Sequence, residues 1–187
     1  VQFHYTESEP ILKDFNLKIE AKQRVALVGE TGSGKSTLVN LICRFYEPVS
    51  GAILIDGVDY KERSIGWLHH NLGYVLQSPH LFSGSVIENI RYGKRGASDD
   101  EVIAAAKLVN AHDFIMALDD GYESDVGEGG GRLSTGQKQL ISFARAMIAN
   151  PAIFILDEAT SSIDTETEMV IQHAIENVLK DKTSFII

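Results

Sequence analysis

The sequence lacks the features of disulfide-stapled, membrane-spanning or strongly basic proteins. Its 187 residues include one cysteine, Cys43, so no disulfide can form within the chain, and this thiol among apolar neighbours fits a core residue in a reducing compartment. The longest apolar runs, such as residues 152–156, are far shorter than the roughly 20 residues that cross a bilayer. Acidic residues outnumber basic ones by 26 to 17, giving a net charge of -9, which disfavours nucleic acid or an anionic membrane as the main partner.

The two ends of the sequence indicate a piece of a longer protein. The first residue is Val1 rather than methionine, and residues 1–5 already alternate as a strand would. The last residues, 183–187, form an apolar run that is typical of a strand. Because the length suits one domain with a normal core, we expect a single domain cut from a larger chain.

Short apolar strands alternate with amphipathic helices along most of the sequence. Residues 24–28 have the composition of a buried strand. The apolar residues that follow repeat at the spacing of one helical face: Leu38, Leu41, Ile42 and Phe45. Further strands are expected at residues 51–57, 72–76, 151–158 and 183–187, and further helices at residues 98–109, 112–118 and 166–179.

This order of elements predicts an α/β fold with a mostly parallel sheet and helices packed on it. The core of the single domain is expected to comprise about residues 1–82 and 151–187. Between them, at about 83–150, the pattern is mostly helical, and Ser98 with Glu101 forms a capping-box signature there. We expect this part to form a helical subdomain.

A glycine-rich loop follows the first buried strand. Residues 29–36 fit the pattern G-x-x-x-x-G-K-[ST] between a strand and a helix, which is the context that a phosphate-binding loop requires. Glycines let backbone N–H groups approach phosphate oxygens, and the helix N-terminus adds positive charge. We expect Lys35 to neutralise the outer phosphates and Ser36 to bind Mg²⁺ through its hydroxyl. The nucleotide-binding residues predicted in this stretch are Gly29, Thr31, Gly32, Ser33, Gly34, Lys35, Ser36 and Thr37.

Two acidic residues and a glutamine end strands of the same predicted sheet. One apolar strand leads to Asp157 and Glu158, and another leads to Gln77. The carboxyl ends of parallel strands line the ligand crevice of an open α/β sheet, so both acids can converge there with the glycine loop. We expect Asp157 to bind Mg²⁺ and Glu158 to act as base or to orient the attacking water. Gln77 either reaches the same crevice or is an ordinary turn residue.

A second candidate anion site lies at the start of the helix near residue 135. Ser134 and Gln137 form a capping-box pattern, and this local role explains both residues. It does not explain Gly136, because glycine in the first helical turn costs about 1 kcal/mol relative to alanine. A glycine is favoured there if an anion must approach the helix N-terminus closely.

Together these motifs resemble the ATP-binding cassette (ABC) family over essentially the whole chain. The matches are residues 33–37 with the Walker A motif, 153–157 with Walker B, Gln77 with the Q-loop, 133–137 with the ABC signature and 161–164 with the D-loop. The resemblance implies a P-loop NTPase-type sheet with an antiparallel β portion and a helical subdomain that carries the signature. It also implies ATP and Mg²⁺ as cofactors, with Gln77 as a further Mg²⁺ ligand. In this family two cassettes stack head to tail, so Ser134, Gly136 and Gln137 would contact the ATP held by the partner cassette.

Three further stretches, residues 44–48, 81–90 and 125–128, resemble the cassettes of ABC exporters. The resemblance implies a second cassette, identical or not, and the transmembrane domains of an exporter as partners, at the cytoplasmic face of the cell membrane. Tyr5 falls where exporters place an aromatic ring that stacks on adenine. From the alternating pattern alone, Tyr5 would be a core residue.

Two features depart from the exporter pattern. Thr135 replaces the glycine that is usual in the signature, at a position where exporters vary. Exporter cassettes also carry a histidine just after the last strand, and the sequence stops at Ile187 before reaching it. We therefore expect a cassette truncated before this switch histidine, which binds ATP but hydrolyses little. His69 and His70 are neighbours on a predicted helix and do not face one site, and no His or Cys spacing predicts zinc.

The sequence thus predicts an ATPase in which a head-to-tail dimer couples MgATP hydrolysis to export of a substrate. The alternative is a soluble ABC ATPase that acts on DNA or ribosomes, against which the acidic composition and residues 125–128 argue. A P-loop kinase would leave residues 133–137 unexplained. Nucleic acid is not an expected partner.

Overall fold

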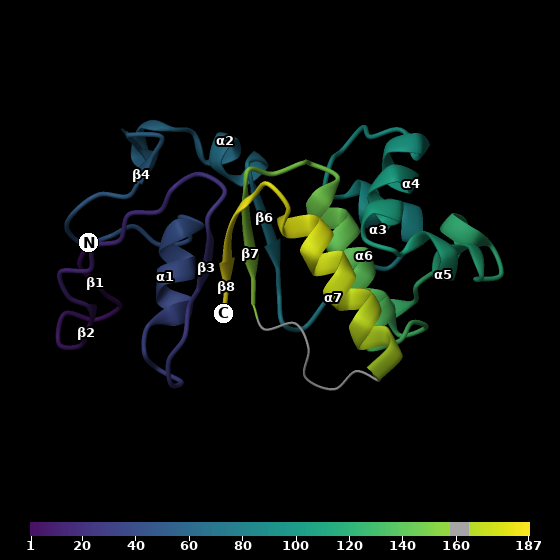
Figure 1. Ribbon diagram of the computed structural model, residues 1–187, viewed down its shortest axis with the longest axis horizontal. Helices are drawn as coiled ribbons and strands as arrows, with labels where there is room; N and C mark the ends of the chain where they lie inside the picture. The colour runs from purple at the N-terminus through teal and green to yellow at the C-terminus, as the bar shows by residue number, and fades with distance from the viewer. Residues whose placement is uncertain (158–164) are drawn as a thin grey trace.

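The computed structural model describes residues 1–157 and 165–187. At its centre, a four-stranded parallel sheet has the strand order β3-β8-β7-β6 (Figure 1). Its strands are β3 (Arg24–Ala26), β6 (Leu72–Val75), β7 (Ile153–Leu156) and β8 (Thr183–Ile186). The predicted α/β fold with a mostly parallel sheet is confirmed.

Helices cover both faces of this sheet because successive side chains of a strand point to opposite faces. The helices are α1 (Lys35–Ile42), α2 (Ile65–His70), α3 (Val86–Arg91), α4 (Asp99–Leu108), α5 (His112–Met116), α6 (Thr135–Met147) and α7 (Thr165–Leu179). Ile155 of β7 packs with Val39 of α1 in one buried cluster. Its neighbour Phe154 belongs to the buried cluster of α6 and α7. Figure 1 accordingly shows α1 on one side of the sheet and α6 and α7 on the other.

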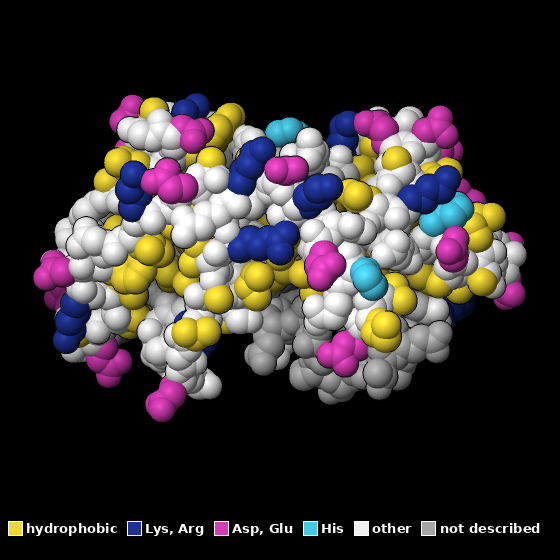
Figure 2. Space-filling model, in the orientation of Figure 1, with side chains coloured by type: hydrophobic (Ala, Val, Ile, Leu, Met, Phe, Trp, Pro, Cys, Tyr) yellow, Lys and Arg dark blue, Asp and Glu magenta, His cyan; other side chains and the backbone are white. Residues whose placement is uncertain are grey.

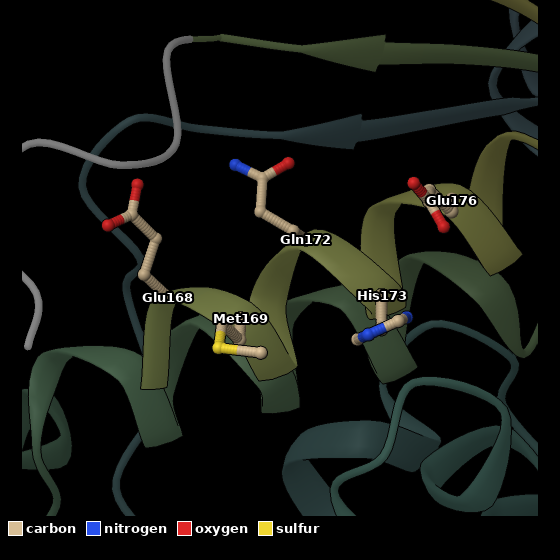
Figure 3. A pocket seen from close by; sticks show the side chains of 5 residues that line it. All are labelled: Glu168, Met169, Gln172, His173 and Glu176. Atoms are coloured by element: carbon tan, nitrogen blue, oxygen red, sulfur yellow. The ribbon is translucent and has the colours of Figure 1, made fainter. Parts of the chain in front are cut away.

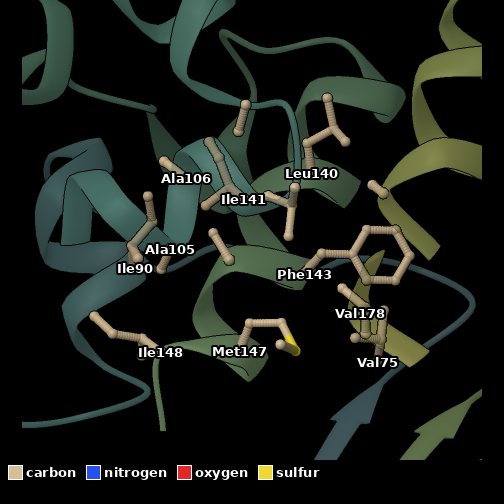
Figure 4. Packing of buried hydrophobic residues seen from close by; sticks show 14 of the residues in the cluster. Val75, Ile90, Ala105, Ala106, Leu140, Ile141, Phe143, Met147, Ile148 and Val178 are labelled. Carbon is tan, nitrogen blue, oxygen red and sulfur yellow. The ribbon is translucent and has the colours of Figure 1, made fainter. Parts of the chain in front are cut away.

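The helices between β6 and β7 form a lobe whose apolar core is continuous with buried residues of β6, β7 and α7 (Figure 4). Ile90 of α3, Ala106 of α4 and Ile141 of α6 are all fully buried in it. Within the described residues, capping boxes begin α3 at Ser85, α4 at Ser98 and α6 at Ser134, and the last two were predicted. Within the described part of the chain, every helix is too short or too polar to cross a membrane.

Two small antiparallel pairs complete the fold, as the predicted antiparallel β portion requires. The strand β1 (Phe3–His4) pairs with β2 (Pro10–Leu12), and β4 (Leu54–Ile55) pairs with β5 (Val58–Asp59). Asp56 and Gly57 join β4 to β5 with φ angles of 53° and 78°. A two-residue turn with both φ angles positive is what an Asp-Gly pair favours, so this turn could be predicted from the sequence.

Some predictions of burial were wrong, and the segment 24–28, predicted as a buried strand, is exposed or half-buried throughout. Val28 is 88% exposed, because β3 is an edge strand that ends at Ala26 and the chain has already turned into the glycine loop. Phe45 is 54% exposed. The helix α1 ends at Ile42 and Arg44 adopts a left-handed conformation with φ of 56°, which takes Phe45 off the buried helical face.

Candidate functional site

The glycine-rich loop connects β3 to α1, as predicted. Gly34 is the N-cap of α1 with φ of 92°, and no side chain caps this helix. A Cβ atom at Gly34 would lie 3.2 Å from Cγ2 of Ile11, so both the backbone angle and the packing favour glycine. The first N–H groups of α1 have no side-chain cap and point to where an anion can bind.

Lys35, the first residue of α1, lies across the glycine loop. Its Nζ donates hydrogen bonds to the carbonyl oxygens of Gly29 at 2.6 Å and Glu30 at 2.8 Å, and to Oγ of Ser33 at 3.4 Å. All three acceptors are neutral. The positive charge is therefore held at the mouth of the loop, beside the N-terminus of α1.

Tyr5 stands beside the first turn of α1. Its hydroxyl oxygen lies 3.3 Å from Oγ1 of Thr37 and accepts a 3.5 Å hydrogen bond from Asn40. The rings of Phe3 and Tyr46 pack edge-on against it, with centroids 4.9 and 5.1 Å away. Because Tyr5 is 47% exposed, the core position suggested by strand alternation was wrong. Thr37 is buried, and its hydroxyl lies beside that of Tyr5.

Gln77 and Asp157 follow two neighbouring strands, β6 and β7. These strands are parallel with Val75 opposite Leu156, and the N–H of Asp157 donates to the carbonyl of Val75 at 3.0 Å. Both side chains therefore emerge at the same end of the sheet, as predicted. The loop that leads into α1 lies at this same lower edge in Figure 1. Glu158 and the predicted D-loop, residues 161–164, lie outside the described residues.

Tyr74 is a neighbour of this site that motif analysis missed. It stands opposite Ile155 in the sheet register, so it shares a face with Asp157. Burial raises the pKa of Tyr74 to about 12, and the charge of the nearby Asp157 carboxylate contributes. The phenol therefore stays neutral at physiological pH. A tyrosine within the apolar run 72–76 is typical of any strand, so no sequence pattern marks Tyr74 as a residue of the site.

The predicted capping box at the start of α6 is present. The N–H of Gln137 donates to Oγ of Ser134 at 3.2 Å, and the N–H of Ser134 donates to Oε1 of Gln137 at 3.0 Å. Ser134 and Thr135 are exposed. Gly136 is buried within the chain.

The starts of α1 and α6 do not share one ligand site within this chain. The helix α1 packs on one face of the sheet and α6 on the other, and Figure 1 shows them on opposite sides of it. A phosphate on the glycine loop is therefore separated by the sheet from Ser134 of the same chain.

The pocket in Figure 3 is not this site. It lies along α7, from which all of its lining residues come: Glu168, Met169, Gln172, His173 and Glu176. Among the described residues, no three His, Cys, Asp or Glu side chains are grouped so that they could hold a metal ion. None of the residues predicted to bind nucleotide lines this pocket.

Comparison with known proteins identifies the family of this chain. A family model described as "ABC transporter" matches residues 12–161, which include the glycine loop, Gln77, the signature and Asp157. The chain belongs to the ABC transporter family.

The relatives place this ABC domain among exporters. Proteins from several strains of Staphylococcus aureus, described as multidrug export ATP-binding/permease proteins, are 53% identical to it over 188 aligned positions. A solved structure of a bacterial Atm1-family ABC exporter with ATP bound matches with a TM-score of 0.90 and 42% identity. Both matches cover 100% of this chain and 32% of the other protein. The chain thus resembles the ATP-binding part of ABC exporters and spans about a third of the length of these relatives.

Proposed function

We propose that this ABC domain binds MgATP and hydrolyses it as a head-to-tail dimer, which powers export of a substrate by associated transmembrane domains. The observation that carries the proposal is the position of the glycine loop and the signature helix on opposite sides of the sheet. One nucleotide can contact both only when a second cassette supplies the signature. The description of the relatives as export ATP-binding/permease proteins supports the coupling to transmembrane domains, and hence a place at the cytoplasmic face of a membrane.

Each end of the nucleotide has a proposed partner. The loop N–H groups and Lys35 bind the phosphates, and the half-exposed ring of Tyr5 stacks on adenine. The hydroxyl of Ser36 and the side-chain oxygens of Gln77 and Asp157 are hard ligands of the kind that Mg²⁺ prefers.

The signature residues would act from the opposite cassette. Ser134 is exposed at the N-terminus of α6 and can meet a phosphate of the partner's nucleotide, aided by the helix dipole. Gly136 and Gln137, in the first turn of the same helix, are proposed to contact the same nucleotide. Glu158, which follows Asp157, is proposed as the base that activates the attacking water.

The domain is proposed to consist of a core, about residues 1–82 and 151–187, and a helical subdomain over about 83–150. The succession of helices between β6 and β7 supports this division, although the lobe shares its apolar cluster with β6, β7 and α7. On the face shown in Figure 2, acidic and basic side chains are interspersed with hydrophobic ones. That mixture gives no support to the alternative of an ATPase acting on DNA or ribosomes, which would bind through basic surfaces.

A cysteine cross-link tests the head-to-tail dimer. The change Thr31→Cys places a thiol on the glycine loop and Thr135→Cys places one beside the signature serine, both at exposed positions. Cys43 does not interfere, because it is fully buried and burial raises its pKa to about 12. When the two variants are mixed with Mg²⁺ and a non-hydrolysable ATP analogue, a disulfide-linked dimer should appear on a non-reducing gel.

Each variant alone is the control for this cross-link. A head-to-tail dimer brings position 31 of one chain to position 135 of the other, so neither variant should link to itself. Absence of a link in the mixture, or an equal link with Thr31→Cys alone, would contradict the arrangement.

The stacking role of Tyr5 gives a second prediction. Tyr5→Ala should raise the Kd for MgATP about tenfold, because one aromatic ring stacked on a base contributes about 1–3 kcal/mol. Binding of inorganic tripolyphosphate should be unchanged, since it has no base. Tyr5→Phe, which keeps the ring and loses the hydroxyl beside Thr37, should bind MgATP nearly normally. Equal losses for ATP and tripolyphosphate in a calorimetric titration would show that Tyr5 supports the loop instead of binding adenine.

A further inference from the structure

A polar cluster holds the segment after Gln77 against the helical lobe. Its central residues are Asn89 of α3, which is 2% exposed, and Arg145 of α6. Nη1 of Arg145 donates to the carbonyl of His80 at 2.9 Å. Its Nε donates to the carbonyl of Asn89 at 2.9 Å, and its Nη2 donates to Oδ1 of the same residue at 2.8 Å. Two helices and the segment 80–82 thus meet at one guanidinium group.

Asn89 binds both backbone groups of Phe82. Its Oδ1 accepts a hydrogen bond from the N–H of Phe82 at 2.9 Å, and its Nδ2 donates to the carbonyl of Phe82 at 2.9 Å. Nδ2 also donates to the carbonyl of Ser85 at 3.0 Å. The amide of Asn89 can do this because its oxygen accepts while its nitrogen donates two hydrogen bonds.

An apolar contact and a cation–π contact also attach the same segment to the lobe. Leu81 is fully buried in the lobe core, and the Cζ atom of Arg145 lies 5.1 Å from the ring centroid of Phe82. The segment 80–82 therefore belongs to the helical lobe although it follows a strand of the central sheet. Gln77 is exposed in the short connection between β6 and this attachment.

The chemistry of Arg145 makes the attachment specific. Its three hydrogen bonds go to neutral oxygens, and burial lowers its pKa. A guanidinium presents several donors in one rigid plane, whereas a lysine ammonium is a single point on a flexible stem. Lysine at position 145 would keep the charge but would not bond His80 and both oxygens of Asn89 together.

We propose that Arg145 and Asn89 are positioning residues for ATP hydrolysis, which link the signature helix α6 to the segment that carries Gln77. When a second cassette binds at Ser134, it displaces the start of α6. Because Arg145 lies near the other end of that helix and is hydrogen-bonded to His80, residues 80–82 move with it. Gln77 then moves relative to the sheet that carries Asp157. This inference rests on the proposed function for the roles of Gln77 and the signature.

The test uses the full-length protein and the variant Arg145→Lys. Its kcat for ATP hydrolysis should fall about tenfold, the effect of losing one or two charge-assisted hydrogen bonds. The KM for MgATP should change little, because Lys35 and Tyr5 are untouched. Arg91→Lys is the matched control, since Arg91 lies in the same lobe and donates to the carbonyl of Ala97 at 3.0 Å. This control should keep normal turnover.

A double-mutant cycle with Gln77→Ala separates positioning from general damage. If Arg145 acts through Gln77, then Gln77→Ala lowers kcat and the addition of Arg145→Lys lowers it no further. Independent, additive losses would overturn the inference and leave the proposed function standing, as would normal kcat in Arg145→Lys alone. Normal kcat in Gln77→Ala alone would reject the role of Gln77 and the inference with it.

Asn89→Asp provides a second variant if Arg145→Lys does not fold. It keeps an acceptor for Arg145 and for the N–H of Phe82 but loses the donor to the carbonyl of Phe82. Its kcat should fall by a smaller factor, and this loss should also disappear in the Gln77→Ala background. A loss that persists there would overturn the inference.

Discussion

Glu158→Gln should lower ATP turnover by roughly 10²–10⁴-fold, the usual contribution of a general base, while MgATP stays bound. A glutamine is nearly the same size as glutamate but cannot take the proton of the attacking water. The phosphate contacts of the loop before α1 do not involve position 158, so affinity is retained. Phosphate release from the full-length protein measures turnover, and a nucleotide titration of the same variant measures binding.

The matched control for this change is Glu176→Gln, on an exposed position of α7. It removes the same charge from the helix that follows the site and should leave turnover normal. Because the Glu158→Gln protein binds but does not hydrolyse, MgATP itself should then support the cross-link between positions 31 and 135. Rapid phosphate release by Glu158→Gln would remove Glu158 from the mechanism.

Local signals in the sequence were enough to locate most helix starts. The capping boxes at Ser98 and Ser134 depend on residues three positions apart, so the sequence displays them completely. The same pattern, Ser85 with Glu88, begins α3 and could have been found in the same way. The glycine loop before α1 is equally local, and its position between β3 and α1 follows from the sequence.

Contacts between distant parts of the chain could not be predicted. Arg145 lies on an amphipathic helix, where an arginine usually faces water, yet its partners His80 and Asn89 are 65 and 56 residues away. The contact between Tyr5 and Thr37 spans 32 residues, and strand alternation placed Tyr5 in the core instead. In each case the fold decides which polar groups meet, and no periodicity of one segment contains that information.

The parts of the candidate site that lie in one continuous stretch of sequence could be predicted. The parts that depend on how separate segments pack together could not. The motif around Lys35 and the strand end at Asp157 are continuous stretches, and the parallel sheet brings strand ends together by geometry alone. The burial of Gly136 depends on how α6 packs, which its pattern does not reveal. Tyr74 likewise lies beside Asp157 because of the register between β6 and β7, which the sequence of either strand does not contain.

Lys35→Ala should weaken MgATP binding by about 10–100-fold, because a charge-assisted hydrogen bond contributes about 1.5–3 kcal/mol. Without nucleotide, Lys35 already donates to the carbonyl oxygens of Gly29 and Glu30. Lys35 therefore contributes to affinity only the difference between the free energy of its phosphate contacts and that of these two hydrogen bonds. Phosphate oxygens carry full negative charge whereas the two carbonyls are neutral, so the exchange favours the bound state.

A calorimetric titration of the chain with MgATP measures this loss, and Lys18→Ala is its control. Lys18 is a surface lysine with an exposed ion pair to Glu20, so its removal subtracts the same charge far from the loop and should leave the Kd unchanged. Because Lys35 meets the phosphates and not the base, tripolyphosphate should lose as much affinity as ATP does, the opposite of the result expected for Tyr5→Ala. An unchanged Kd in Lys35→Ala would mean that the lysine keeps its bonds to the loop carbonyls when nucleotide binds.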